Sequence, residues 1–160
     1  MLEARRAGRS VDKIYIQLGS SDGSIQTILR EAKKHDTIVS FVSKERLNQM
    51  SETGNHQGII AIVASYEYAS VEVILARAVE KGEAPFLFLL DGIEDPHNFG
   101  AIIRTANLAG AHGVIITKHR AVGLTATVAK ASAGAVNYTP VAKVTNLGNT
   151  IEQLKKEGIW

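Results

Sequence analysis

The 160-residue sequence contains no cysteine and no long apolar run. Without cysteine, disulfide bonds, thiolate zinc sites and cysteine nucleophiles are excluded, and nothing indicates an oxidising compartment. No apolar run approaches the roughly 20 residues that a membrane-spanning helix needs, and the basic N-terminal segment lacks the apolar stretch of a signal peptide. We therefore expect a cytoplasmic protein that has no membrane partner.

The sequence has 18 Lys and Arg residues and 16 Asp and Glu residues, so neither sign of charge is in clear excess. The total charge therefore neither demands nor excludes a polyanionic partner, and any basic surface must be local. Most of the cations near the N-terminus are arginines: Arg5, Arg6 and Arg9. These residues are candidate phosphate contacts. An equally good explanation is that they lie in solvent at the C-terminal end of a helix, where the helix dipole favours positive charge.

Several catalytic motifs are also missing from the sequence. The histidines form neither H-x-x-x-H nor HExxH, so we expect no metal site. The absence of a P-loop and of GxGxxG excludes Walker NTPases, kinases and ordinary dinucleotide-binding dehydrogenases. Ser132 does not lie within G-x-S-x-G, so it is expected to be a small packing residue at a helix end rather than a nucleophile.

Apolar runs alternate with amphipathic stretches along the chain, which predicts an α/β fold. In the N-terminal part we expect strands at residues 13–18, 37–42 and 58–65, and helices at 24–35 and 44–50. In the remainder we expect strands at 86–90, 113–117 and 138–144, and helices at 70–81, 99–109, 125–132 and 149–157. This second series predicts a parallel sheet with helices on both faces. Residues 158–160 are expected to begin another strand.

The densest local signal is the segment of residues 91–110, DGIEDPHNFGAIIRTANLAG, which follows an apolar strand and opens a helix. Asn98 is a candidate N-cap for that helix. Arg104 lies about 140° around the helix from Phe99 and so faces away from the predicted core. Gly100 and Ala101 beside it are small enough to leave room for a ligand. When this helix is considered alone, Asn98 is more often a structural cap than a functional residue, and Arg104 is more often an exposed surface arginine.

As one block, residues 95–100, 103–106 and 110 resemble the first signature motif of the SpoU family of RNA 2′-O-methyltransferases, also called the TrmH family, in the SPOUT superfamily. Residues 125–135 and 144–147 resemble the members that methylate a guanosine ribose in large-subunit ribosomal RNA. Residues 54–58 resemble the end of their N-terminal RNA-binding domain, which is similar to a ribosomal protein. The resemblance covers nearly the whole chain.

The resemblance implies a small ribosomal-protein-like α/β domain followed by the N-terminal half of a parallel-sheet SPOUT methyltransferase domain. Its boundaries would be residues 1–68 for RNA substrate binding, 69–85 for a linking helix, and 86–160 for the partial methyltransferase domain. The family's G-x-E-x-x-G and S-L-N-V-S-x-A motifs, which form the knot and bind most of the cofactor, do not occur here. We therefore expect a chain truncated before the knot, with no cofactor-binding residues and no activity alone.

The implied reaction is methylation of a ribose 2′-hydroxyl by S-adenosylmethionine, with a guanosine of 23S rRNA as target and a homodimer as the full-length form. Arg104 and Asn98 would be the catalytic residues. Because the guanidinium pKa lies above about 12, we expect Arg104 to hold a phosphate and stabilise the developing alkoxide rather than act as a base. A tRNA 2′-O-methyltransferase and a non-enzymatic RNA-binding module are the alternatives.

The N-terminal domain would select the RNA, since specific RNA recognition usually targets unpaired bases held against a protein surface. Besides the three N-terminal arginines, the implied RNA-binding residues are Asn55, His56 and Gln57. A simple turn before a strand, marked by Gly54 and Gly58, is the alternative interpretation and the more frequent one.

Overall fold

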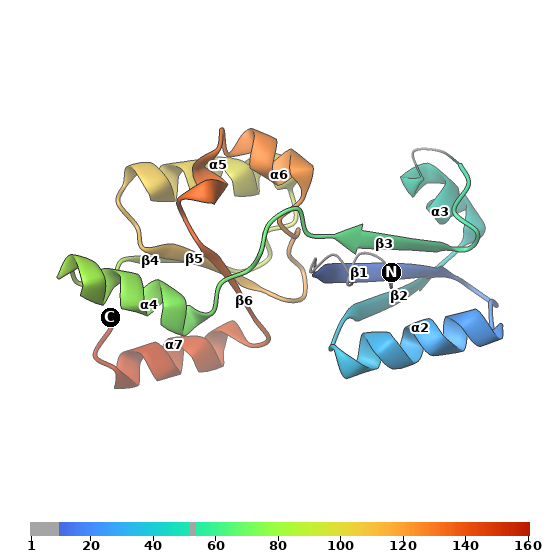
Figure 1. Cartoon of the computed structure of the whole chain (residues 1–160), viewed down its shortest axis with the longest axis horizontal. Coiled ribbons are helices and arrows are strands. Elements are labelled where there is room, and N and C mark those ends of the chain that lie inside the picture. Colours follow the sequence, from blue (N-terminus) through green and yellow to red (C-terminus); the bar gives the residue numbers. More distant parts are fainter. Residues whose placement is uncertain (1–9, 52–53) are drawn as a thin grey trace. The chain divides into compact units, whose positions relative to one another are not determined.

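The computed structural model describes residues 10–51 and 54–160, and the chain divides into two compact units, Met1–Ala64 and Ser65–Trp160 (Figure 1). Arg5, Arg6 and Arg9 lie outside the described residues. Within the described ranges, no helix is both long and apolar enough to cross a membrane.

The N-terminal unit is a three-stranded mixed sheet with the order β2-β1-β3. Strand β1 (Val11–Gln17) pairs parallel with β2 (Ile38–Val42) and antiparallel with β3 (Ile59–Val63). Helix α2 (Gly23–Lys34) connects β1 to β2, and its buried Ile25 and Ala32 pack with Ile14 and Ile16 of β1. Helix α3 (Lys44–Met50) contributes the buried Leu47.

Hydrogen bonds at the helix N-termini of both units lower the pKa of carboxyl groups there. Asp22 accepts the backbone N–H of Ile25 at 2.9 Å, and this hydrogen bond lowers the pKa of Asp22. At the start of α4 (Val71–Lys81), a hydrogen bond with Ser70 lowers the pKa of Glu72. Because these pKa values are depressed in the folded chain, the carboxylates stabilise it above their ordinary pKa, and this stability is lost as the pH falls.

The C-terminal unit is a parallel three-stranded sheet with the order β4-β5-β6, which confirms the predicted fold class. Its strands are β4 (Leu87–Leu90), β5 (Gly113–Thr117) and β6 (Val141–Val144). Helices α4 and α7 (Leu147–Lys156) cover one face (Figure 1). The other face is covered by α5 (Pro96–Leu108), α6 (Ala126–Ala131) and a short 3-10 helix, η1 (Ala135–Asn137).

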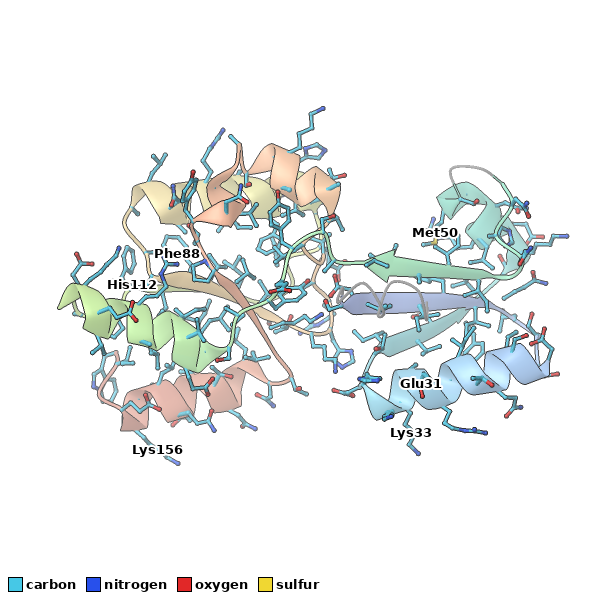
Figure 2. The ribbon with its side chains drawn as sticks, viewed as in Figure 1. Glu31, Lys33, Met50, Phe88, His112 and Lys156 are labelled. Atoms are coloured by element: carbon cyan, nitrogen blue, oxygen red, sulfur yellow. The ribbon has the colours of Figure 1, made fainter. Side chains whose placement is uncertain are left out.

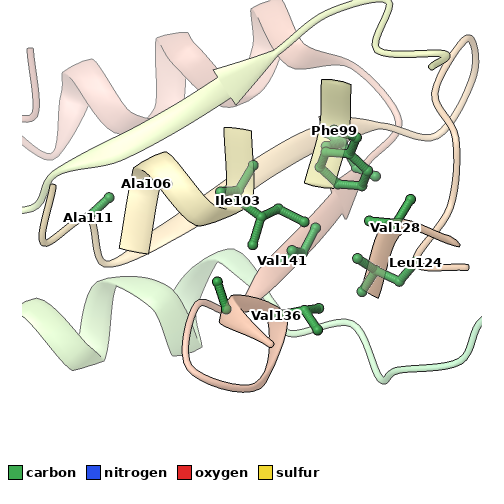
Figure 3. Close-up of a cluster of buried hydrophobic side chains, with 11 residues drawn as sticks. Phe99, Ile103, Ala106, Ala111, Leu124, Val128, Val136 and Val141 are labelled. Atoms are coloured by element: carbon green, nitrogen blue, oxygen red, sulfur yellow. The ribbon is translucent and has the colours of Figure 1, made fainter. Parts of the chain in front are cut away.

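Helix α5 is fixed to this sheet by one buried stripe of its surface. Phe99, Ile103 and Ala106 are completely buried, and they pack with residues of α6, η1 and β6 (Figure 3). These three positions recur at a spacing of three to four residues, so they occupy one side of the helix. The opposite side of α5 is thereby left for solvent.

Gly100 lets α5 approach α6 more closely than any larger residue would allow. A Cβ atom at this position would lie 2.4 Å from Ala131 Cβ and 2.8 Å from the backbone carbon of Ala131. Gly113 plays a similar part on the other face, where an added Cβ would lie 2.6 Å from Ile74 Cδ1. Each helical layer therefore has a contact at which a glycine leaves room that a side chain would fill.

Most predicted helix and strand bounds differ from the observed ones by one or two residues, and the largest differences fall at the starts of α5 and β6. Helix α5 begins at Pro96 rather than Phe99, and β6 begins at Val141 rather than Tyr138 because η1 precedes it. The expected strand at 158–160 does not form. Instead, Gly158 N–H donates to Lys155 O, and Ile159 N–H donates to Leu154 O, which closes the end of α7.

Replacing Gly100 with Ala should destabilise the C-terminal unit by about 1–3 kcal/mol, because the added methyl group overpacks the contact with α6. Denaturant unfolding followed by circular dichroism measures the loss. Gly23→Ala is the matched control, since a Cβ there meets nothing within 4 Å. Equal stability of the two variants would contradict the close approach at Gly100.

Candidate functional site

The loops that follow β4, β5 and β6 meet at the carboxyl edge of the parallel sheet, where open α/β folds usually bind ligands. Hydrogen bonds connect these loops. Val122 N–H donates to Ile93 O at 2.7 Å, and Lys118 N–H donates to Val144 O at 2.8 Å. An ion pair of 3.4 Å joins Arg120 of the second loop to Asp91 of the first.

Asp95, not Asn98, caps helix α5. The Asp95 carboxylate accepts the backbone N–H of Asn98 at 2.7 Å, and Pro96 occupies the first helical position. Proline is well suited to that position because it has no N–H to leave unpaired, and aspartate is as good a cap as asparagine. The prediction that Asn98 is the N-cap was therefore wrong. Its exposed side-chain amide has no capping role and can meet a ligand.

Arg104 is exposed on the solvent side of α5, as the helical spacing predicts. It makes no hydrogen bond or ion pair with any other residue that the structure describes. It lies six positions after Asn98, which corresponds to about 9 Å along the helix axis. The structure therefore places both groups on the exposed surface of one helix, separated from each other.

The expected ligand space at Gly100 is occupied by protein. Gly100 is buried, and its missing side chain makes room for Ala131 of α6. The open surface beside Arg104 lies elsewhere, toward Leu108 one turn along the helix, which is 81% exposed. The interpretation of Gly100 as room for a ligand was wrong, and its physical role is helix packing.

Two polar residues near α5 have structural roles. Ser132 is completely buried, and its hydroxyl donates to Ala129 O at 2.7 Å, as expected for a packing residue rather than a nucleophile. The buried Thr139 hydroxyl donates to Asn107 Oδ1 on α5 at 3.2 Å. This hydrogen bond fixes the side chain of Asn107, which lies about one turn beyond Arg104 on α5.

In the N-terminal unit, His56 is held within the turn that precedes β3. Its Nδ1 accepts the backbone N–H of Gly58 at 3.0 Å, and its Nε2 lies 2.8 Å from Asn48 Oδ1. Both ring nitrogens thus have protein partners. Asn55 and Gln57 on either side are exposed, and Gln57 has a φ of 48°, in the left-handed region that few non-glycine residues adopt.

One buried histidine serves the framework. His112, which Figure 2 labels, is 2% exposed, and its Nδ1 accepts the backbone N–H of Phe86 at 3.0 Å. Its Nε2 lies 3.0 Å from Glu83 Oε2, so the ring connects the segment before β4 to the start of β5. Within the described ranges, no three His, Asp or Glu residues form a group that could hold a metal ion.

Sequence reasoning missed the pair formed by Arg120 and Asp91. The available signal was the run Lys118-His119-Arg120 directly after a predicted strand, beside an acidic loop after the neighbouring strand. Predicting the pair itself required knowing that β4 and β5 are adjacent and in parallel register, which brings the two loops together.

Comparison with known proteins matches both parts of the chain. Residues 1–69 match the family described as RNA 2′-O ribose methyltransferase substrate binding, and residues 85–160 match the SpoU rRNA Methylase family. A Bacillus subtilis (strain 168) protein named as a TrmH family tRNA/rRNA methyltransferase, YacO, is 47% identical over 160 residues, which are 100% of this chain and 64% of the relative. A Staphylococcus aureus (strain MW2) protein named in the same way is 46% identical over 99% of this chain and 63% of its own length.

The chain thus spans less than two thirds of the length of these relatives. Among solved structures, the SpoU methyltransferase AviRb from Streptomyces viridochromogenes, in complex with AdoMet, aligns with a TM-score of 0.48 and 21% identity. That alignment covers 96% of this chain and 54% of AviRb.

Replacing Asp95 with Ala should destabilise the C-terminal unit by about 1 kcal/mol, because α5 loses its N-cap. Asn98→Ala removes a side chain of similar size three residues later and should change the unfolding free energy by less than about 0.5 kcal/mol. Thermal and denaturant unfolding measure both variants. A larger loss for Asn98→Ala than for Asp95→Ala would restore Asn98 as the cap.

Proposed function

The chain belongs to the SpoU rRNA methylase family, and we propose that it takes part in transferring a methyl group from S-adenosylmethionine to the 2′-oxygen of an RNA ribose. The observation that carries this proposal is the position of Arg104 on the exposed side of α5, within the family's first motif, where it pairs with none of the residues that the structure describes. The preferred substrate is a guanosine of 23S rRNA, with tRNA as the second candidate. Both relatives are named for both kinds of RNA.

Arg104 would position the target nucleotide. A ribose hydroxyl is a weak acid, so its methylation depends on alignment with the methyl donor and on easing removal of the proton. The guanidinium can hold a phosphate by two parallel hydrogen bonds and stabilise charge that develops on the 2′-oxygen. The guanidinium has only hydrogen-bond donors and stays charged, so it cannot accept the hydroxyl proton. The proton leaves through the phosphate or water. Because no described residue pairs with Arg104, no ion pair must break first.

Asn98 would shape the same surface from the first turn of α5. Its amide provides both donors and an acceptor, and Asp95 already satisfies the backbone of that turn. The side chain can therefore orient a ribose or base without a cost in helix stability.

The N-terminal unit would select the RNA, with Asn55 and Gln57 as direct contacts. His56 would shape the turn through its two ring hydrogen bonds, and any contact it makes with RNA would come from the ring face. Arg5, Arg6 and Arg9 would add phosphate contacts. Single-stranded or looped RNA is the expected target, since unpaired bases expose their edges to side chains.

We propose that the residues of this chain do not by themselves form the binding site for S-adenosylmethionine. An adenosyl group needs an enclosed, mostly apolar slot. The carboxyl edge of the parallel sheet instead presents charged, open side chains: Asp91 is 59% exposed and Arg120 is 71% exposed. We therefore assign the cofactor no residues in this chain, and we propose that the whole protein acts as a cytoplasmic homodimer in which other residues hold it.

Methyl transfer to RNA tests the proposal. A chimera that joins residues 1–160 to the remaining third of the Bacillus subtilis relative should transfer tritiated methyl groups from S-adenosylmethionine to 23S rRNA. Arg104→Ala in the chimera should lower the rate at least about 100-fold, as expected for the loss of an electrostatic contact in the transition state. The 160 residues alone should transfer none.

Lys156→Ala, which removes a cation from the last turn of α7, is the control and should keep the parent rate. Nucleoside analysis of the product should find the methyl group on a ribose oxygen. RNA binding by a folded chimera that transfers no methyl group would replace the enzyme proposal with a non-enzymatic RNA-binding module.

A further inference from the structure

The ion pair between Arg120 and Asp91 occupies the carboxyl edge of the parallel sheet without being buried there. The nitrogen and oxygen atoms lie 3.4 Å apart, and the two side chains are 71% and 59% exposed. Exposed pairs of this kind contribute little to stability, because water and salt screen them. Stability therefore does not account for the pair.

The backbone of Arg120 is also in an unfavourable conformation. Its φ is 54°, in the left-handed region, where a non-glycine residue is strained. Such strain persists only where the surroundings impose it, and it is frequent at ligand-binding positions. Here the surroundings are identifiable: the Thr117 hydroxyl donates to His119 O, and Val122 N–H donates to Ile93 O at 2.7 Å. These bonds hold the backbone on both sides of Arg120 while its side chain remains in solvent.

We propose that Arg120 is a phosphate contact for RNA at this edge, and that the Asp91 carboxylate takes the place of the phosphate until RNA binds. The inference rests on the proposed function, because it names a second point at which the same RNA touches the C-terminal unit. An arginine guanidinium binds carboxylate and phosphate with the same fork of donors, so one can exchange for the other. Lys118 lies two residues before Arg120 and adds positive charge to the same loop.

The neighbouring loop holds three acidic residues, Asp91, Glu94 and Asp95, and the one that pairs with Arg120 sets the strength of this contact. Asp95 is already engaged by the Asn98 N–H and by the positive end of α5, and Asp91 is engaged by Arg120. When Arg120 turns to a phosphate, its ion pair with Asp91 must break first. Asp91 therefore weakens binding, and its removal should strengthen it.

Filter binding of the 160-residue chain to 23S rRNA, over a series of KCl concentrations, tests the exchange. Arg120→Ala should weaken binding about 3- to 10-fold and reduce the salt slope by about one, as for the loss of one phosphate contact. Asp91→Asn should tighten binding about 2- to 3-fold, but only while Arg120 is present. Arg120→Lys should recover part of the affinity, since it keeps the charge without the fork.

Lys156→Ala removes one cation from the carboxyl end of α7 and measures the general effect of charge. If Arg120→Ala weakens binding no more than this control, while Arg104→Ala does weaken it, the Arg120 contact is wrong and the proposed function stands. If Asp91→Asn tightens binding equally with and without Arg120, the exchange is wrong. If the unaltered chain binds no RNA, the proposed function fails together with this contact. Thermal unfolding of each variant confirms that the compared proteins are folded.

Discussion

The close approach of α5 to α6 at Gly100 is the constraint on which the candidate site depends. Any side chain at this position would meet Ala131, so the two helices can lie together only because Gly100 has none. The contact fixes the rotation of α5 about its axis, since Phe99 and Ile103 must fill the core beneath it. With that rotation set, Arg104 has no direction available except toward solvent.

The parallel sheet sets the second part of the site. Because β4 and β5 run in the same direction, the loops after them begin at the same edge, and an acidic loop meets a basic one. The result is a surface with two separate arginines, one on the side of a helix and one in a strained loop. Two cations at different points suit an extended, regularly charged ligand such as RNA better than a small molecule, which would need an enclosed pocket.

The sequence predicted the features that local patterns determine. The bounds of β5 were predicted correctly, and the helical spacing from Phe99 predicted the exposure of Arg104. Asn98 was misassigned because two good capping residues compete within four positions, and Pro96 decides between them. Contacts between distant segments were not predictable. The role of Gly100 depends on α6, and the Arg120–Asp91 pair joins residues 29 positions apart.

The most direct test of the central claim, that the exposed side of α5 faces RNA, is a nuclear magnetic resonance titration of the 160-residue chain with an unmethylated fragment of 23S rRNA. The account predicts a shift of the Arg104 Nε–H signal and of the Asn98 side-chain amide, with little change along α7. Shifts confined to the N-terminal unit, with both α5 signals unmoved at saturation, would contradict it.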